Sequence, residues 1–247
     1  TPVDELKSTS QKKDLKFKVK RKKFAKNAEV EKQHLKGINP SDLEINNLLQ
    51  HYKNGQQDDA EKLALSITDR FPKHPFAWKV LGAVLKQTGR IVESLAPMQK
   101  SVQLAPQDAQ AHANLGVTLK ELGKLEESEA SHAHAIALKP NFVEAHFNLG
   151  NTLKELGKLD EAAASYTKAI ALKPDFAEAH GNLGNTLKKL GRLEDAEASY
   201  TKTIALKPNF AEAHSNLGNT LKELGRLEDA EASYTKAIAL KPNFAEA

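Results

Sequence analysis

"NLGNTLKELGRLEDAEASYTKAIALKPNFAEA" closes the chain at residues 216–247, and almost the same residues stand one period earlier. The stretches 177–210 and 211–244 differ at three positions only, Gly181/Ser215, Lys189/Glu223 and Thr203/Ala237. One series of prolines shares the period, each 34 residues after the last: Pro72, Pro106, Pro140, Pro174, Pro208 and Pro242. Self-similarity at a fixed period of this length is typical of a repeat array.

Each period predicts two helices. In 143–176, apolar residues fall on one helical face as far as Leu156. Gly157 follows directly and suits a left-handed helix stop. A second apolar stripe starts at Leu159, and Pro174 prevents its continuation. One such pair cannot bury its apolar face alone, so neighbouring pairs must stack to complete the core.

Two local features refine the expected helix ends. An Asx residue followed by Glu three positions later predicts a capping box at two helix starts, Asn209 with Glu212 and Asp175 with Glu178. Pro97 falls inside the second helix expected in 75–108. It predicts a kink, or a helix start delayed to near Ser94.

The conserved spacing of large and small residues within one period resembles the tetratricopeptide repeat (TPR) family. In 211–244 the positions that carry the resemblance are His214, Leu217, Gly218, Leu221, Ala230, Tyr234, Ala237 and Pro242. The resemblance implies an all-α fold, a right-handed superhelical solenoid of antiparallel helix pairs whose first helices line a concave groove. Most members of the family bind peptides or partner proteins and catalyse nothing.

The predicted domain organisation has two parts, a basic N-terminal extension over 1–37 and a TPR solenoid over 38–247. The six full repeats are 41–74, 75–108, 109–142, 143–176, 177–210 and 211–244, followed by a three-residue stub. Terminal repeats normally need a solvated cap, and the last one shows none, which favours truncation from a longer parent. The Asn-Leu-Gly-Asn tetrad also resembles the repeats of O-linked N-acetylglucosamine transferases, and those of bacterial repeat proteins that precede glycosyltransferase or sulfotransferase domains.

A polar stripe lies opposite the apolar stripe of each first helix. The candidate partner-binding residues on it are Asn114, Asn148, Asn151, Asn182, Asn185, Asn216 and Asn219, flanked by Lys120, Lys154, Lys188 and Lys222. Asn carries both donors and an acceptor, so it can pair with a peptide bond from either side. Packed helices lie roughly 10 Å apart, which an extended peptide covers in about three residues. The stripe therefore predicts a groove for an extended peptide; alternatively, duplication has copied a solvated Asn.

Other kinds of site are absent or unfavoured in the sequence. The chain has no cysteine, so it has no thiolate metal site and no cysteine nucleophile. The histidines at His112, His146, His180 and His214 stand a full repeat apart, too far to share one metal ion, and fill the large packing position of the family. Glu at the second position of the last three repeats argues against a clamp for a C-terminal carboxylate. No phosphate loop, hydrolase elbow or metalloprotease motif occurs, and we expect no catalytic residue, cofactor or metal.

The N-terminal extension has a charge balance of its own. Residues 1–36 hold 12 basic and 5 acidic residues, whereas the rest of the chain is mildly acidic. The run "KKDLKFKVKRKKFAKN" at 12–27 resembles a nuclear-import signal and can bind nucleic acid, anionic lipid or an acidic protein surface. The candidate docking residues are Lys16, Lys18, Lys20, Arg21, Lys22 and Lys23. A solvated, disordered tail is the alternative.

These patterns favour a non-catalytic scaffold that binds a protein or peptide in an Asn-lined groove, with the basic tail as a second docking element. One alternative is the substrate-recognition arm of a glycosyltransferase or sulfotransferase that continues beyond residue 247. Another is a subunit of a large complex, or a solenoid that stacks head to tail through its open C-terminal face. No apolar run reaches the ~20 residues of a membrane span, so a soluble intracellular location is expected.

Overall fold

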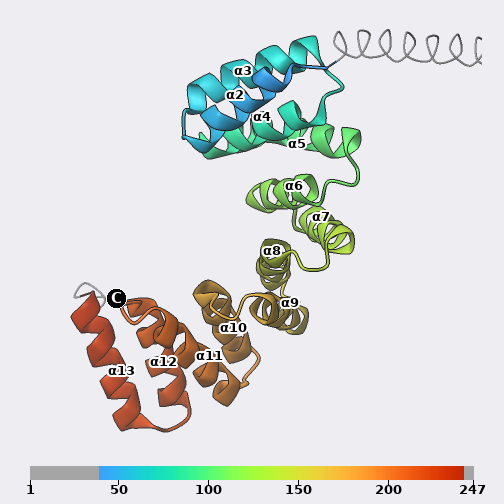
Figure 1. Cartoon of the computed structure of the whole chain (residues 1–247). Coiled ribbons are helices and arrows are strands. Elements are labelled where there is room, and N and C mark those ends of the chain that lie inside the picture. Colours follow the sequence, from blue (N-terminus) through green and yellow to red (C-terminus); the bar gives the residue numbers. More distant parts are fainter. Residues whose placement is uncertain (1–38, 242–247) are drawn as a thin grey trace, which may run out of the picture. The chain divides into compact units, whose positions relative to one another are not determined.

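The computed structural model describes residues 39–241, and this part of the chain contains twelve helices and no strand (Figure 1). The helices are α2 (Asp42–Lys53), α3 (Gln57–Arg70), α4 (Pro75–Gln87), α5 (Ile91–Leu104), α6 (Ala109–Glu121), α7 (Leu125–Leu138), α8 (Val143–Glu155), α9 (Leu159–Leu172), α10 (Ala177–Lys189), α11 (Leu193–Leu206), α12 (Ala211–Glu223) and α13 (Leu227–Leu240). The prediction of an all-α helical-repeat solenoid is confirmed.

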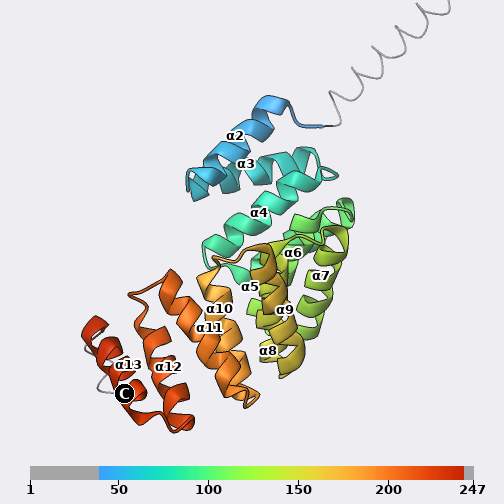
Figure 2. The same cartoon turned by 60° about the horizontal axis from the view of Figure 1, so that its bottom comes forward.

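The chain divides into two units within α4. One unit ends at Leu81 and contains α2 and α3, and the other begins at Gly82 and contains α5 to α13. In the second unit, consecutive helices pack side by side from α5 to α13, as Figure 2 shows for α8 to α13. Each helix pair thus covers the apolar face of the next, as stacking of repeats requires.

A glycine with positive φ ends the first helix of every pair. The six residues have φ between 71° and 78°: Gly55, Gly89, Gly123, Gly157, Gly191 and Gly225. Side chains with a Cβ rarely adopt this left-handed conformation. The glycine stop predicted at the end of the first helix is confirmed, and it fixes where α8, α10 and α12 end.

The two predicted capping boxes are wrong. Phe210 precedes α12 and Phe176 precedes α10 in the N-cap position, and no side chain caps either helix. Instead, the carbonyl of Phe210 accepts a bond from the amide of Ala213 at 3.0 Å, so the backbone satisfies a first-turn donor itself. Side-chain caps do occur elsewhere: Ser41 forms a complete capping box at α2, and Asp108 caps α6.

Pro97 lies inside α5, which begins at Ile91, so the predicted delay of the helix start to near Ser94 is wrong. The amide of Ser94 already donates to the carbonyl of Arg90 at 3.1 Å. The first turn therefore forms ahead of the proline, which itself has no N–H to donate within the helix.

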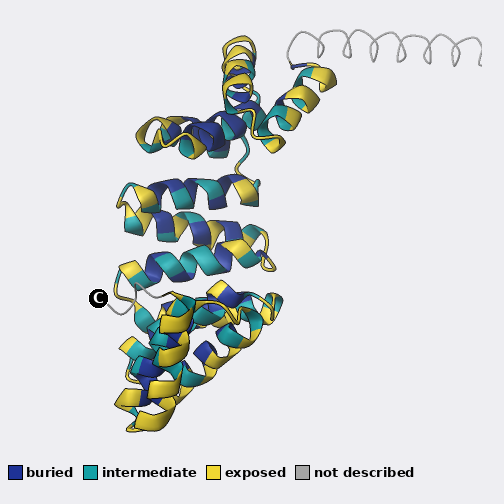
Figure 3. Cartoon of the chain, turned by 90° about the vertical axis from the view of Figure 1, so that its left-hand side faces the viewer, coloured by how far each residue is buried: buried dark blue, intermediate teal, exposed yellow. Residues whose placement is uncertain are grey.

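From α6 and α7 onward, the core of each pair rests on a close approach between its two helices. Buried residues line the inner faces of the helices, whereas the helix ends and turns are exposed (Figure 3). In α8, a Cβ added at Gly150 would lie 2.6 Å from the ring of Tyr166 on α9. The same relation holds between Gly184 and Tyr200. Glycine is therefore required here because the ring occupies the space of a side chain.

Candidate functional site

Six asparagines of the last three repeats form one surface, which we call the asparagine face. They come from α8, α10 and α12 and are all half-buried: Asn148, Asn151, Asn182, Asn185, Asn216 and Asn219. Their common position follows from the helical spacing of three residues within each helix and from the stacking of the pairs. The same two asparagine positions therefore occur three times along the face, once in each helix pair.

A hydrogen-bond network links the repeats across this face. The Oδ1 atom of Asn151 accepts bonds from the hydroxyl of Tyr166 at 2.8 Å and from the Nδ2 atom of Asn182 at 2.9 Å. The tyrosine belongs to the same repeat, and Asn182 belongs to the next one. Because both partners donate, the orientation of the Asn151 amide is fixed by the network.

The next repeat contains the same network. The Oδ1 atom of Asn185 accepts bonds from Tyr200 at 2.7 Å and from Asn216 at 3.1 Å. In the last repeat, Asn219 accepts from Tyr234 at 2.7 Å. Burial raises the pKa of Tyr166 and of Tyr200, so both hydroxyls stay protonated and can donate at neutral pH.

The network leaves part of each amide unpaired. Asn151 and Asn185 use Oδ1 for two bonds, and no described residue accepts a bond from their Nδ2 atoms. Asn182 uses one N–H, which leaves its carbonyl oxygen and a second N–H. The face therefore offers donors and acceptors at fixed positions and repeats them once per helix pair.

The repeat 109–142 departs from this arrangement. Asn114 accepts a bond from Gln110 on its own helix at 2.9 Å, and Val117 and His132 replace the asparagine and tyrosine of the network. His132 is fully buried, and neither ring nitrogen has a hydrogen-bond partner. Burial lowers the pKa of His132 to about 4, so the ring is neutral at physiological pH. The network thus begins at Asn151.

Two of the four candidate lysines, Lys120 and Lys188, form ion pairs between adjacent first helices. A lysine of one repeat pairs with a glutamate of the next in Lys86–Glu121 at 3.4 Å, Lys120–Glu155 at 2.9 Å and Lys188–Glu223 at 3.0 Å. Lys154 has Lys189 at the corresponding position instead. Burial first, and then the charge of Lys189, lowers the pKa of Lys154. Lys222 has no ion-pair partner among residues 39–241.

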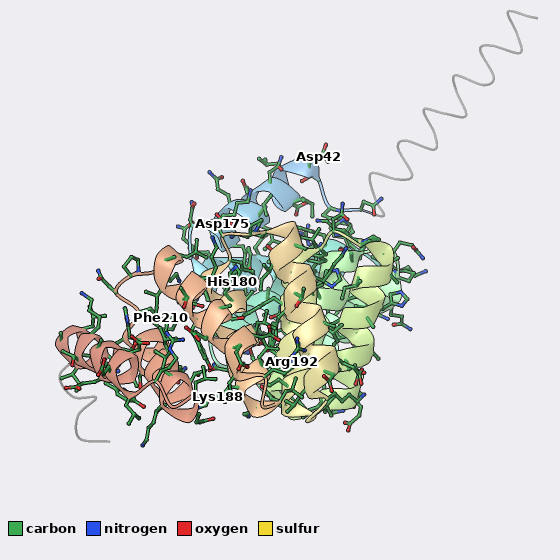
Figure 4. The ribbon with its side chains drawn as sticks, turned by 90° about the horizontal axis from the view of Figure 1, so that it is seen from below. Asp42, Asp175, His180, Lys188, Arg192 and Phe210 are labelled. Atoms are coloured by element: carbon green, nitrogen blue, oxygen red, sulfur yellow. The ribbon has the colours of Figure 1, made fainter. Side chains whose placement is uncertain are left out.

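Two hollows open on the asparagine face beside α10. One, of about 210 Å³, is lined by Phe147, Gly181, Phe210 and Ala213 together with Glu178, Asn182, Asn185, Tyr200, Glu212 and Asn216. The other, of about 470 Å³, is lined by Lys154, Asn185, Lys188, Lys189, Tyr200, Asn216 and Glu223. In Figure 4, His180 and Lys188 mark the two ends of α10. The first hollow is mainly aromatic and apolar, with Glu178 and Glu212 also in its lining, and we call it the apolar hollow. The second has three lysines against one glutamate, and we call it the cationic hollow.

The histidines form hydrogen bonds to the turns that connect successive repeats. The Nε2 atom of His146 lies 2.9 Å from the carbonyl oxygen of Pro140, six residues earlier, and three further histidines repeat the contact. Trp78 donates to Pro72 in the same way at 2.8 Å. Within the described residues no group of three or more His, Cys, Asp or Glu could hold a metal ion. The packing position assigned to the histidines thus includes a hydrogen bond that the spacing alone did not reveal.

The predicted docking residues of the basic run, Lys16, Lys18, Lys20, Arg21, Lys22 and Lys23, lie outside the described residues. Over residues 39–241, none of the helices has both the length and the apolar character needed to cross a membrane.

Comparison with known families identifies the repeats. A family model described as TPR repeat matches residues 118–157, 150–191 and 184–225. Two models described as tetratricopeptide repeat match residues 211–244 and 49–109. No curated protein matches the chain.

Solved structures share the fold at low sequence identity. A crystal structure of MamA has a TM-score of 0.63 at 23% identity and covers 68% of this chain and 98% of its own. MamA from Desulfovibrio magneticus has a TM-score of 0.65 at 20% identity, covering 68% and 96%. YrrB, described as a TPR protein with an unusual peptide-binding site, has a TM-score of 0.64 at 20% identity, covering 73% and 93%. At these identities the likeness concerns the fold alone.

Proposed function

Since the chain belongs to the tetratricopeptide repeat family, whose members are typically protein-interaction modules without catalysis, we propose that it is a non-catalytic scaffold for a partner protein. The finer proposal is that an extended segment of the partner binds along the asparagine face. The fold supports the general role, and YrrB, which shares it, is described as having a peptide-binding site.

The unpaired amide groups of the asparagine network carry this proposal. The Tyr166 and Asn182 bonds hold the Asn151 amide in one orientation before any ligand arrives. A peptide that pairs with its Nδ2 atom therefore does not have to order that side chain, which lowers the entropic cost of binding. Because the unpaired groups recur at each helix pair, they suit a ligand whose own donors and acceptors recur, such as an extended backbone.

Site-specific crosslinking tests where a partner binds. A photoreactive residue replaces Ser215 on the asparagine face in one variant and Lys202 on the exposed side of α11 in another. We expect Ser215 to crosslink one short segment of a partner, identified by mass spectrometry, and Lys202 to give no such segment. Crosslinks to one defined segment from Lys202 alone would contradict the proposal.

Alanine variants then test the role of the amides, with the crosslinked segment as a synthetic peptide. Asn148 makes no side-chain hydrogen bond within the described residues, so Asn148→Ala removes a ligand contact without disturbing the network. We expect weaker peptide binding with unchanged helicity. The triple variant at Asn148, Asn182 and Asn216 should weaken binding further, and unchanged affinity in it would exclude the asparagine face as the contact surface.

The basic run is the second docking element of the proposal. Affinity capture of partners from a lysate, with the full chain and with a chain without residues 1–36, separates the two elements. A partner retained by the shortened chain binds to the repeats, and a partner lost with the run binds to the tail. The transferase-arm and assembly alternatives stay predictions.

A further inference from the structure

The three differences between the repeats 177–210 and 211–244 are not scattered. Gly181 and Lys189 both lie on α10, and each lines one of the two hollows of the asparagine face. The third, Thr203, is fully buried on α11 and donates to the carbonyl of Ser199 at 2.9 Å. Both differences that reach the surface therefore change the same small region.

The apolar hollow exists because α10 has no side chain at residue 181. The equivalent residue is Phe147 in α8 and Ser215 in α12. A Cβ added at Gly181 would make only an ordinary van der Waals contact, 3.7 Å from the side chain of Thr203, so a side chain fits there without a clash and its absence leaves room for a ligand. Aromatic side chains line the hollow, and Phe210 is 37% exposed there. An apolar side chain of a ligand would remove this aromatic surface from water.

The cationic hollow exists because Lys189 stands where the neighbouring repeats have the glutamate that pairs with a lysine of the preceding first helix. Lys188 is paired with Glu223 at 3.0 Å, but Lys154 and Lys189 have no carboxylate in an ion pair. Lys154 is half-buried, so its ammonium group is partly removed from water without a partner. Glu155 and Glu212 act in the opposite direction on its pKa, but more weakly than burial and Lys189. An anionic group entering this hollow would gain two charge-assisted contacts.

One ligand can reach both hollows, since Asn185, Asn216 and Tyr200 line each of them. Gly181 and Lys189 are eight residues apart on one helix, which corresponds to about 12 Å along its axis. An extended peptide spans that distance in about three or four residues.

We propose that the repeat 177–210 selects the partner peptide, taking an apolar side chain beside Gly181 and, three or four residues away, an aspartate or glutamate carboxylate between Lys154 and Lys189. This inference rests on the proposed function, because it assumes that a peptide binds along the asparagine face. It assigns the selectivity to one of the three repeats that form the asparagine face and names the chemical class of the ligand.

Peptide libraries test the assignment on the full chain without a known partner. Each 12-residue library fixes leucine and, three or four positions away in either direction, glutamate, with random residues elsewhere. Matched libraries replace the glutamate by glutamine, lysine or phosphoserine, or the leucine by glycine. We expect the glutamate library to bind about tenfold more tightly than the glutamine library, as for a hydrogen bond to a charged group.

Three variants locate the effect. Lys189→Glu restores the common partner of Lys154 and should abolish the preference for glutamate, whereas Lys202→Glu, the same charge change on the exposed side of α11, should retain it. Gly181→Phe copies Phe147 into α10 and should abolish the preference for leucine only.

The outcomes separate this inference from the proposed function. Equal binding of the glutamate and glutamine libraries, both weakened by Asn148→Ala, would overturn the inference and leave the asparagine face intact. A glutamate preference that persists in Lys189→Glu would overturn the assigned position. Tighter binding of phosphoserine than of glutamate would assign the hollow to phosphate, and no binding of any library would contradict both proposals.

Discussion

The repeat 109–142 and the three repeats that follow it build the same helix pair with different chemistry between the helices. Gly150 lies against Tyr166, and Gly116 lies against His132, with an added Cβ 2.6 Å from the ring in both. Only the tyrosine reaches an asparagine, because Val117 stands where the later repeats have one. The helix pair therefore depends on a ring packed on a glycine, and the polar network is an addition confined to the last three repeats.

The largest predicted difference between these regions is their response to acid. His132 has a pKa of about 4 in the fold and about 6.5 in the unfolded chain, so only the unfolded chain binds a proton between these values. Stability contributed by the neutral ring is present above pH 6.5 and is lost as pH falls towards 4. We expect a loss of about 3 kcal/mol at most, measured by urea unfolding and by hydrogen exchange in α6 and α7.

The double variant Val117→Asn with His132→Tyr sharpens this comparison. It gives the repeat 109–142 the asparagine and tyrosine of its neighbours and removes the buried imidazole. The acid-dependent loss of protection in α6 and α7 should disappear. An identical loss in the double variant would show that other groups, such as surface carboxylates, cause it.

The second prediction concerns the glycine on which a ring packs in all four of these repeats. In Gly184→Ala, the new Cβ would lie 2.7 Å from the ring of Tyr200, which is too close for unaltered packing. We expect a destabilisation of about 1–3 kcal/mol in urea unfolding, as for overpacked cores. Gly181→Ala, on the same helix, has 3.7 Å of clearance and should be neutral or stabilising by up to about 1 kcal/mol. Equal effects of both variants would contradict the close-approach argument.

The sequence was sufficient for the fold because the fold depends on strong local signals. Prolines and glycines at a period of 34 residues mark the helix ends, and Gly157 has φ 76° as a helix stop requires. The N-caps were mispredicted because Phe210 and Phe176, not the preceding polar residues, occupy the position from which the helix starts. At these starts the local capping pattern was overridden by the geometry of the turn between repeats.

The asparagines were found from the sequence, but their mutual bonds were not. Asn151 and Asn182 are 31 residues apart, and their contact depends on the stacking of two repeats. One signal was present in the sequence: Val117 and His132 change together, whereas the later repeats keep Asn and Tyr together. Paired changes of this kind indicate contact between two positions.

The third prediction breaks the network at one repeat. Tyr200→Phe removes one of the two bonds to Asn185 and should cost about 1 kcal/mol. Asn185→Ala leaves both the Tyr200 hydroxyl and the Asn216 amide without their acceptor and should cost about 1–3 kcal/mol. Asn148→Ala is the matched control, since it breaks no side-chain bond. Unfolding by urea should show the largest loss for Asn185→Ala, a smaller loss for Tyr200→Phe and none for Asn148→Ala. A loss from Asn148→Ala as large as that from Asn185→Ala would remove the network as the cause.

The smallest predicted effect concerns the interrupted row of ion pairs. Lys189→Glu should give Lys154 the partner that Lys120 and Lys188 already have, and it should raise stability by about 0.2–1 kcal/mol at low salt. The gain should shrink as salt screens the pair. Lys202→Glu, the control, introduces the same charge on the exposed side of α11 and should bring no comparable gain. If Lys189→Glu both stabilises the chain and abolishes the preference for acidic peptides, Lys189 lowers the stability of the fold at the position where it serves binding. If the variant brings no gain in stability, Lys154 is already adequately solvated without a partner.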